Sequence, residues 1–147
     1  MKISDILKEN KEQVLYLVRG ISGSGKSTYA HKLKEQGLVD SVLEADQYFV
    51  DSKGNYNFEP SKIKQAHSYC QSKTKELLSK GRSVAVANTF TKKWEMDFYV
   101  KLAESLGITL KIIRLETRYK NIHNVPEEVV KDMEERFEDY PSEQIVK

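Results

Sequence analysis

The chain has a single cysteine and no long apolar run, and both absences limit what it can be. Cys70 has no partner for an internal disulfide, and no spacing of cysteine and histidine is typical of a zinc site. No stretch approaches the roughly 20 apolar residues that a membrane-spanning helix needs. The first eleven residues are too polar for a signal peptide. We therefore expect a cytoplasmic protein with no membrane partner.

Internal repeats, low-complexity tracts and long linkers are also missing. A length of 147 residues fits one compact domain, so we expect a single domain over residues 1–147. Hydrophobic residues make up 39% and charged residues 31% of the chain. This composition favours a soluble, globular protein over a disordered one.

The net charge of +2 hides an uneven distribution. Residues 126–147 contain eight acidic and three basic side chains, a net charge of −5, so residues 1–125 carry +7. A basic body suits a polyanionic ligand, either a nucleotide or a nucleic acid. A solvated, lysine-rich surface would have the same composition, so charge alone does not identify the ligand.

Apolar runs alternate with segments of helical character along the chain. Strands are expected at Val14–Val18, Ser41–Ala45, Ser83–Ala87 and Ile108–Leu115, and helices at Lys26–Gln36, Pro60–Gly81, Lys93–Leu106 and after Pro126. Residues 51–57 read as a turn-rich loop. This alternation predicts right-handed βαβ units and an α/β fold with a three-layer parallel sheet. Chemistry is then expected at the carboxyl ends of the strands, where Lys26, Asp46, Asn88 and Glu116 fall.

A phosphate-binding motif lies between the first expected strand and helix. The pattern G-x-x-x-x-G-K-[ST] occurs at Gly20, Gly25, Lys26 and Ser27, in the context that a P-loop requires. Backbone N–H groups and the helix N-terminus would bind phosphate, and the loop glycines would permit positive φ. Lys26 is expected to reach the β- and γ-phosphates and Ser27 to bind Mg²⁺. We predict ATP and Mg²⁺ as cofactors, with nucleotide contacts from Gly20, Ser22, Gly23, Ser24, Gly25, Lys26, Ser27 and Thr28.

Transfer of a phosphoryl group also needs a residue that activates the acceptor. Asp46 follows the second expected strand and would lie across the cleft from the γ-phosphate, which favours it as general base or acceptor-orienting carboxylate. Glu44, expected on the same strand face, is a less favoured candidate. The alternative for Asp46 is a helix N-cap before Gln47.

Several short segments share one family pattern, in order, from about Val14 to Phe137. They are Arg19-Gly20, Ser24–Thr28, Ala45–Phe49, Gly54-x-Tyr56-x-Phe58-x-Pro60, Ala66-His67, Ala87–Thr89, Trp94–Met96 and Asn121–Pro126. Together they resemble the polynucleotide-kinase-like branch of P-loop kinases. That branch includes phage-type 5′-polynucleotide kinases and the kinase-like domains of Nedd4-binding-protein relatives.

The resemblance implies a nucleoside-monophosphate-kinase-like P-loop NTPase fold with a small C-terminal lid at about residues 117–127. It implies ATP-dependent phosphorylation of the 5′-hydroxyl of DNA or RNA, with single-stranded or end-exposed nucleic acid as partner. Asp46 matches the family's acceptor-activating aspartate and Lys120 a lid arginine, with Arg118 as a further candidate lid cation. The predicted acceptor-binding residues are Asp46, Phe49, Asn88 and Thr89.

The chain departs from that pattern on the acceptor side. Phage-type enzymes have an arginine at the position of Phe49, an aspartate at that of Asn88, and a second lid arginine that is missing before Val125. The absence of the first arginine favours an alternative, a kinase of a small metabolite, nucleoside or nucleotide sugar. Asn88 keeps open a second alternative, an ATP-binding regulatory or adaptor module without significant turnover. Aromatic residues are candidates either for stacking on bases or for core packing: Tyr48, Phe49, Tyr56, Phe58 and Trp94.

Overall fold

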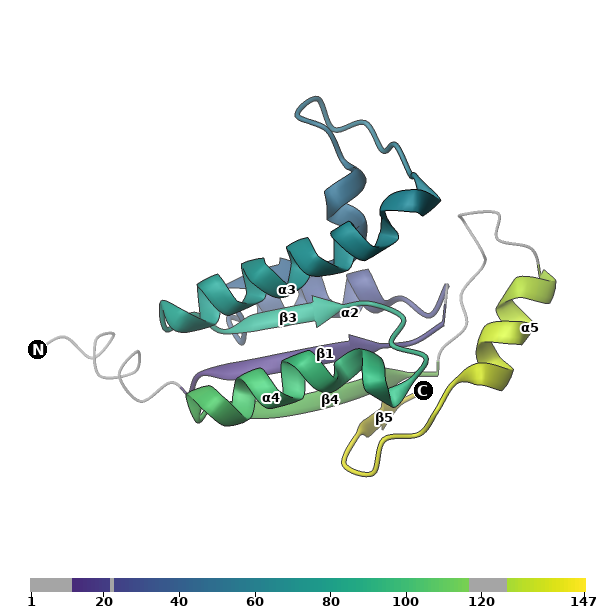
Figure 1. Ribbon diagram of the computed structural model, residues 1–147. Coiled ribbons are helices and arrows are strands. Elements are labelled where there is room, and N and C mark those ends of the chain that lie inside the picture. The colour runs from purple at the N-terminus through teal and green to yellow at the C-terminus, as the bar shows by residue number, and fades with distance from the viewer. Residues whose placement is uncertain (1–11, 22, 117–126) are drawn as a thin grey trace, which may run out of the picture.

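A computed structural model describes residues 12–21, 23–116 and 127–147 (Figure 1). Its sheet has five parallel strands in the order β2-β3-β1-β4-β5. The strands are β1 (Val14–Arg19), β2 (Ser41–Leu43), β3 (Val84–Ala87), β4 (Thr109–Leu115) and β5 (Gln144–Val146). The α-helices are α2 (Lys26–Glu35), α3 (Ile63–Ser79), α4 (Asp97–Leu106) and α5 (Glu127–Arg136). The described residues also form three 3₁₀ helices, η1 (Ala45–Phe49), η2 (Pro60–Lys62) and η3 (Lys93–Met96).

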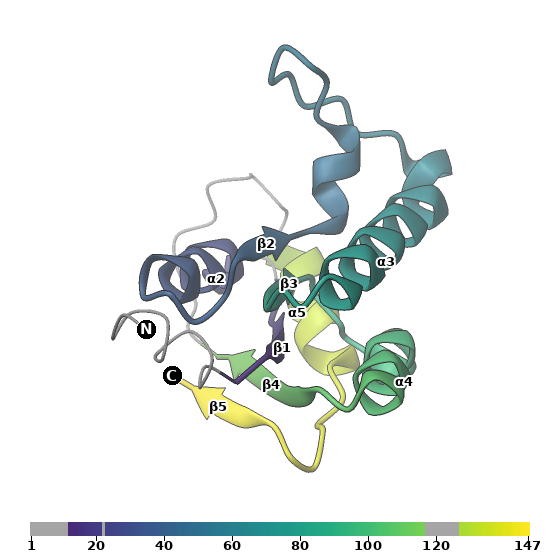
Figure 2. The ribbon, with the colours of Figure 1, turned by 90° about the vertical axis from the view of Figure 1, so that its left-hand side faces the viewer.

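The sheet lies between two helical layers, with α2 on one face and α3 and α4 on the other (Figure 2). Because side chains alternate along a strand, β1 supplies both cores. Leu15 and Leu17 pack in the core beneath α3 and α4, whereas Tyr16 and Val18 pack with the residues of α2. The predicted three-layer parallel α/β fold is thereby confirmed.

The helix ends follow the glycines that the sequence marks as stops. Gly107, the C-cap of α4, has a φ of 66°, and Gly37 after α2 has a φ of 76°. Glycine adopts this left-handed conformation without the cost that a Cβ imposes. The predicted extents of these two helices are confirmed to within a few residues, with η3 forming the first turn of the Lys93–Leu106 segment.

Two features of the sheet differ from the prediction. The second strand ends at Leu43 rather than Ala45, because the Ala45 N–H donates to Asn88 Oδ1 at 3.0 Å and the chain turns into η1. The edge strand β5 was not predicted. Its three residues are too few to give a pattern, and its pairing with β4 is extended by the Glu116 N–H, which donates to the Val146 carbonyl at 2.8 Å.

Residues 50–59, called the finger below, form the predicted turn-rich loop and project from the body at the top of Figure 1. Asp51 Oδ1 accepts the backbone N–H groups of Lys53 and Asn55, each at 2.9 Å, and Gly54 turns the chain with a φ of 84°. An antiparallel bridge pairs Val50 with Tyr56, so the finger is a small, internally bonded hairpin.

Candidate phosphate-binding and catalytic site

The phosphate loop connects β1 to α2 at the carboxyl edge of the sheet. Gly23 and Gly25 have φ values of 82° and 85°, as predicted, and Gly25 is the N-cap of α2. The Ser24 N–H donates to the Ile21 carbonyl at 3.2 Å, which closes the loop below the helix N-terminus. The first N–H groups of α2 have no acceptor within the helix, so this end attracts anions.

Gly20 serves the loop in a different way from the one that we expected. Its φ is not positive; instead, a Cβ at this position would overlap Ser24 Oγ and lie 3.1 Å from the Leu115 carbonyl oxygen. The absence of a side chain therefore lets the root of the loop pack directly against the end of β4.

Replacing Gly20 by alanine is expected to displace Ser24 and weaken nucleotide binding. Overpacking of this kind lowers the free energy of unfolding by about 1–3 kcal/mol. Nucleotide titration and urea denaturation measure the two effects. Gly37→Ala is the control, because Gly37, unlike Gly20, has a positive φ and has open space where a Cβ would lie. It should lose stability while keeping its nucleotide affinity; equal affinities in the two variants would contradict this role of Gly20.

Lys26 and Ser27, the first residues of α2, lie close to two carboxylates. Lys26 Nζ donates to the Ile21 carbonyl at 3.2 Å. Burial lowers the pKa of Lys26, and the charges of Glu44 and Asp46 oppose that shift. The Ser27 hydroxyl hydrogen-bonds to Glu44 Oε1. Thr28 lies exposed one residue further along α2.

Asp46 lies within η1 rather than at its start, so the N-cap alternative is wrong. Glu44 occupies the N-cap position and makes no side-chain cap hydrogen bond. Asp46 is exposed, and its Oδ1 accepts a hydrogen bond of 3.4 Å from the Tyr56 hydroxyl. The structure thus brings Asp46 and Glu44 from the β2–η1 junction to the phosphate loop. Glu44, the candidate that the sequence favoured less, makes the direct contact, a hydrogen bond with Ser27.

Asn88 and Thr89 follow β3, next to the loop. Asn88 is buried; its Oδ1 accepts the Ala45 N–H at 3.0 Å, and its Nδ2 lies 3.9 Å from the Cys70 sulfur. The Asn88 side chain therefore positions the segment that carries Asp46. The Thr89 carbonyl accepts the Gly20 N–H at 3.3 Å. Contacts of either side chain with an acceptor stay predictions, as does that of Phe49, which is buried in an aromatic cluster.

A buried ionic network below the loop was not foreseen. Arg19, which directly precedes Gly20, is 0% exposed, and its Nη1 lies 2.6 Å from Oε2 of Glu143, which is 4% exposed. The Arg19 Nη2 and Nε groups donate to the Phe90 carbonyl at 2.6 and 3.1 Å. Burial lowers the pKa of Arg19, and the hydrogen bond and charge of Glu143 oppose that shift.

Phe137 connects this network to α5. Its ring lies 4.2 Å from the guanidinium carbon of Arg19 and 4.5 Å from that of Arg114, both within cation–π range. Arg114 also pairs with Glu143 at 3.2 Å. The segment after α5 is thus fixed to the root of the phosphate loop.

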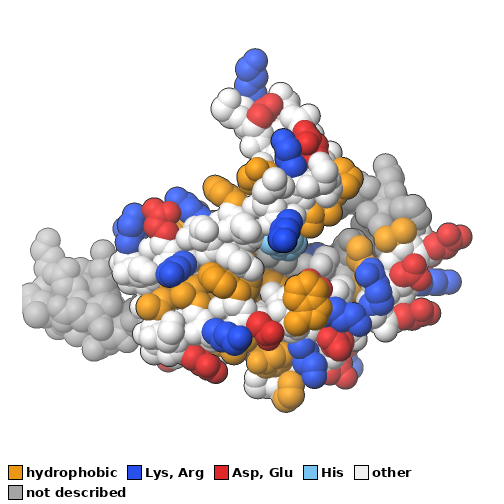
Figure 3. Space-filling view, in the orientation of Figure 1, with side chains coloured by type: hydrophobic (Ala, Val, Ile, Leu, Met, Phe, Trp, Pro, Cys, Tyr) orange, Lys and Arg blue, Asp and Glu red, His pale blue; other side chains and the backbone are white. Residues whose placement is uncertain are grey.

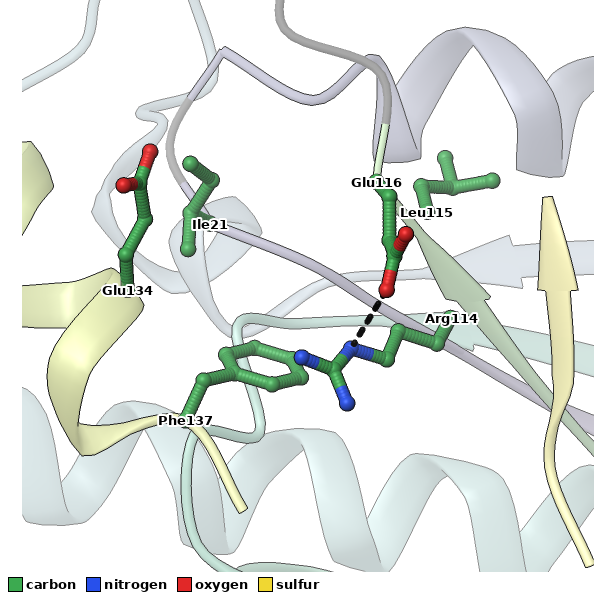
Figure 4. Close-up of a pocket in the computed structure, with 6 residues that line it drawn as sticks. All are labelled: Ile21, Arg114, Leu115, Glu116, Glu134 and Phe137. Carbon is green, nitrogen blue, oxygen red and sulfur yellow. Dashed lines mark ion pairs between the residues drawn. The ribbon is translucent and has the colours of Figure 1, made fainter. Parts of the chain in front are cut away.

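A pocket of about 270 Å³ opens beside the loop, above this network (Figure 4). Ile21 from the loop and Glu134 from α5 lie beside each other on one side of the pocket, and Arg114, which pairs with Glu116 at 3.8 Å, lies on the other side. An apolar wall with a few polar groups suits a small ligand adjoining the phosphate site. The predicted contacts of Ser22, Arg118 and Lys120 lie outside the described residues, as does all but the last residue of the predicted lid.

No helix among the described residues is long and apolar enough to cross a membrane. Within the same residues, no group of three or more His, Cys, Asp or Glu side chains could hold a metal ion. Magnesium in phosphoryl-transfer sites is bound through one or two protein groups and the substrate phosphates, so Ser27 and Glu44 supply the appropriate donor types.

The parallel sheet, the glycine loop and the lysine at the start of α2 define a P-loop nucleotide-binding protein. Residues 15–140 match the model of a family described as an AAA domain, and the chain belongs to that family. Human NEDD4-binding protein 2 is 32% identical over 143 residues, covering 90% of this chain. This chain spans only 8% of that relative's length.

Solved structures with the same fold include kinases. A gluconokinase from Sinorhizobium meliloti 1021 has a TM-score of 0.59 at 16% identity, covering 92% of this chain and 82% of that one. A chain of a Pnkp1/Rnl/Hen1 complex has a TM-score of 0.59 at 15% identity, covering 84% of this chain and 39% of that one. The matches to the family model and to NEDD4-binding protein 2 confirm the sequence resemblance to the polynucleotide-kinase-like branch of P-loop proteins. The solved structures show that the fold is that of P-loop kinases.

Proposed function

We propose that the chain is an ATP-dependent kinase that phosphorylates the 5′-hydroxyl end of DNA or RNA. The observation that carries the proposal is the meeting of Lys26 and Ser27 with Glu44 and Asp46 at one edge of the sheet. A cation and free N–H groups suit the donor phosphates, and an exposed carboxylate beside them suits the activation of a hydroxyl. The match to NEDD4-binding protein 2 and the fold shared with the Pnkp1 complex support this choice.

In the proposed reaction, the oxygen of the acceptor hydroxyl forms a bond to the γ-phosphorus, and Asp46 accepts the proton of that hydroxyl. The bond from that phosphorus to the β,γ-bridging oxygen breaks, and ADP leaves with the bonding electron pair. Lys26 and the N–H groups of the loop stabilise charge on the phosphoryl oxygens. Bound Mg²⁺ supplies further charge neutralisation on the phosphates, and Ser27 and Glu44 would hold it.

Glu44→Gln is expected to raise the Mg²⁺ concentration that nucleotide binding requires, by about 10- to 100-fold. The variant keeps the shape of the side chain and removes the charge that faces Ser27 and Lys26. Titration of a fluorescent ATP analogue at a series of Mg²⁺ concentrations measures this without turnover. Glu35→Gln, at the exposed far end of α2, is the control. Superimposable titrations for the two variants would contradict the role of Glu44.

A small-molecule kinase is the second candidate, and the burial of Phe49 favours it. This side chain fills the core of an aromatic cluster, so position 49 offers no cation to grip an acceptor phosphate. The gluconokinase of the same fold also supports this alternative.

An assay with labelled ATP separates the candidates. The protein is given 5′-hydroxyl oligonucleotides of DNA and RNA in one series and fractionated metabolite pools in the other. The proposal expects label at the 5′ ends of oligonucleotides. Label only in metabolites selects the second candidate, and ATP binding without label in either series selects a regulatory or adaptor module.

A further inference from the structure

An aromatic cluster lies where the finger joins η1 and α3, next to Asp46. Phe49 is its buried centre, with ring centroids 5.5 Å from Tyr48, 6.3 Å from Tyr56 and 5.1 Å from Phe58, all at steep interplanar angles. Tyr69 from α3 completes the cluster, 5.9 Å from Tyr48. Edge-to-face contacts of this kind fix the positions of the rings.

The outer rings of the cluster keep much of their surface in solvent. Tyr56 is 55% and Phe58 48% exposed, and Tyr48 and Tyr69 also count among the exposed large hydrophobic residues. Figure 3 shows hydrophobic side chains gathered where the finger meets the body. An exposed, contiguous apolar group on a small protein marks an interaction site, because folding alone does not require it.

The geometry of the finger aims this surface at the site. Tyr56 and Phe58 have ring planes within 12° of parallel, with centroids 6.4 Å apart. The backbone bond from Asn57 N–H to the Phe49 carbonyl, 2.8 Å long, ties the finger to η1, and the Tyr56 hydroxyl donates to Asp46 Oδ1. An acceptor whose hydroxyl reaches Asp46 therefore has its adjoining atoms beside these rings.

We propose that Tyr56 and Phe58 form a stacking platform for the unpaired bases at the 5′ end of a single-stranded nucleic acid. The inference rests on the proposed function. Stacking on these two rings would bind the acceptor strand in place of the phosphate-binding arginine that phage-type enzymes have at position 49. Aromatic faces stack on every base, so the platform selects single-stranded ends without reading sequence.

Tyr56 has a second role as a positioning residue, because its hydroxyl contacts Asp46. Tyr56→Phe keeps the ring and removes the hydroxyl, so it should bind oligonucleotide as the wild type does. It should lower kcat for 5′-phosphorylation with little change in KM. A merely structural hydroxyl would leave kcat unchanged.

The test of the platform uses equilibrium binding, which does not depend on turnover. A fluorescent single-stranded DNA hexanucleotide with a free 5′-hydroxyl is titrated with protein in the presence of a non-hydrolysable ATP analogue. Phe58→Leu keeps an apolar side chain against Phe49 but removes the ring face, and it should weaken binding by about 5- to 150-fold. Phe58→Trp should restore it. Two altered ligands are tested with the wild type: a blunt duplex, and a hexanucleotide with abasic 5′-terminal positions. Each should bind the wild type as weakly as the intact single strand binds Phe58→Leu.

The controls separate failure of the platform from failure of the proposed activity. Leu38→Ala removes an exposed apolar side chain just beyond the C-terminal end of α2, the end away from the phosphate loop, and this variant should bind the strand as the wild type does. If 5′ ends are phosphorylated but Phe58→Leu leaves binding and KM unchanged, the platform is wrong and the activity stands. Binding that Phe58→Leu weakens supports the platform even without phosphorylation. If the wild type binds no strand and Phe58→Leu instead abolishes self-association, the cluster is a protein interface and the inference is overturned.

Discussion

Asp46→Asn is expected to lower the rate of phosphoryl transfer by about 10²- to 10⁴-fold, the contribution typical of a general base. Asparagine has nearly the same shape but cannot take up the proton of the acceptor hydroxyl. Asp46 is exposed beside the phosphate loop and bonded only weakly, at 3.4 Å, to Tyr56, so the substitution should leave the fold intact. Single-turnover transfer measures the rate, and calorimetric titration with an ATP analogue should show nearly unchanged nucleotide affinity.

Asp97→Asn is the matched control, because Asp97 is an exposed aspartate in the first turn of α4. It should transfer phosphate at the wild-type rate. The opposite pattern, with full activity in Asp46→Asn and none in Glu44→Gln, would assign the base to Glu44 and contradict the proposed division of roles.

Glu143→Ala is expected to lower the free energy of unfolding by about 3–5 kcal/mol, the cost of leaving one member of a buried ion pair without its partner. Arg19 has no exposed surface, so its charge cannot be solvated once Glu143 is removed. Urea denaturation measures the loss. The damage should reach the site as well, because Arg19 directly precedes Gly20 at the root of the phosphate loop.

Asp139→Asn provides the comparison for that prediction. Asp139 also pairs with Arg114, but its side chain is 90% exposed, so its loss should cost less than about 1 kcal/mol. Joint replacement of Arg19 by methionine and Glu143 by leucine should recover part of the lost stability, because it removes both charges of the pair together while the Phe90 carbonyl loses its two donors. Equal small losses in Glu143→Ala and Asp139→Asn would show that the buried pair contributes little.

The phosphate loop and the layers of the fold could be predicted because their signals are local. The glycine-rich segment that ends in Lys26 and Ser27, between an apolar run and the rest of a helix, predicts a phosphate loop. Gly37 and Gly107 lie directly after helical segments and predict where those helices end. The alternation of strands and helices then leaves a parallel sheet as the solution.

The remaining features depend on contacts between distant parts of the chain. Arg19 and Glu143 are 124 residues apart, and neither carries a local pattern that names the other. The roles of Glu44 and Asp46 depend on β2 ending at Leu43, which is fixed by a bond from Ala45 to Asn88. Composition also could not tell that Phe49 is the buried centre of its cluster while Tyr56 and Phe58 stay exposed.

The most direct test of the proposed kinase is the transfer of labelled γ-phosphate from ATP to a 5′-hydroxyl oligonucleotide, with wild-type and Asp46→Asn proteins assayed side by side. The same strand carrying a 5′-phosphate serves as the blocked acceptor. We predict Mg²⁺-dependent label on the 5′-hydroxyl strand with the wild type, and almost none with Asp46→Asn or on the blocked strand. A folded wild-type protein that binds ATP and labels no DNA or RNA strand would contradict the account.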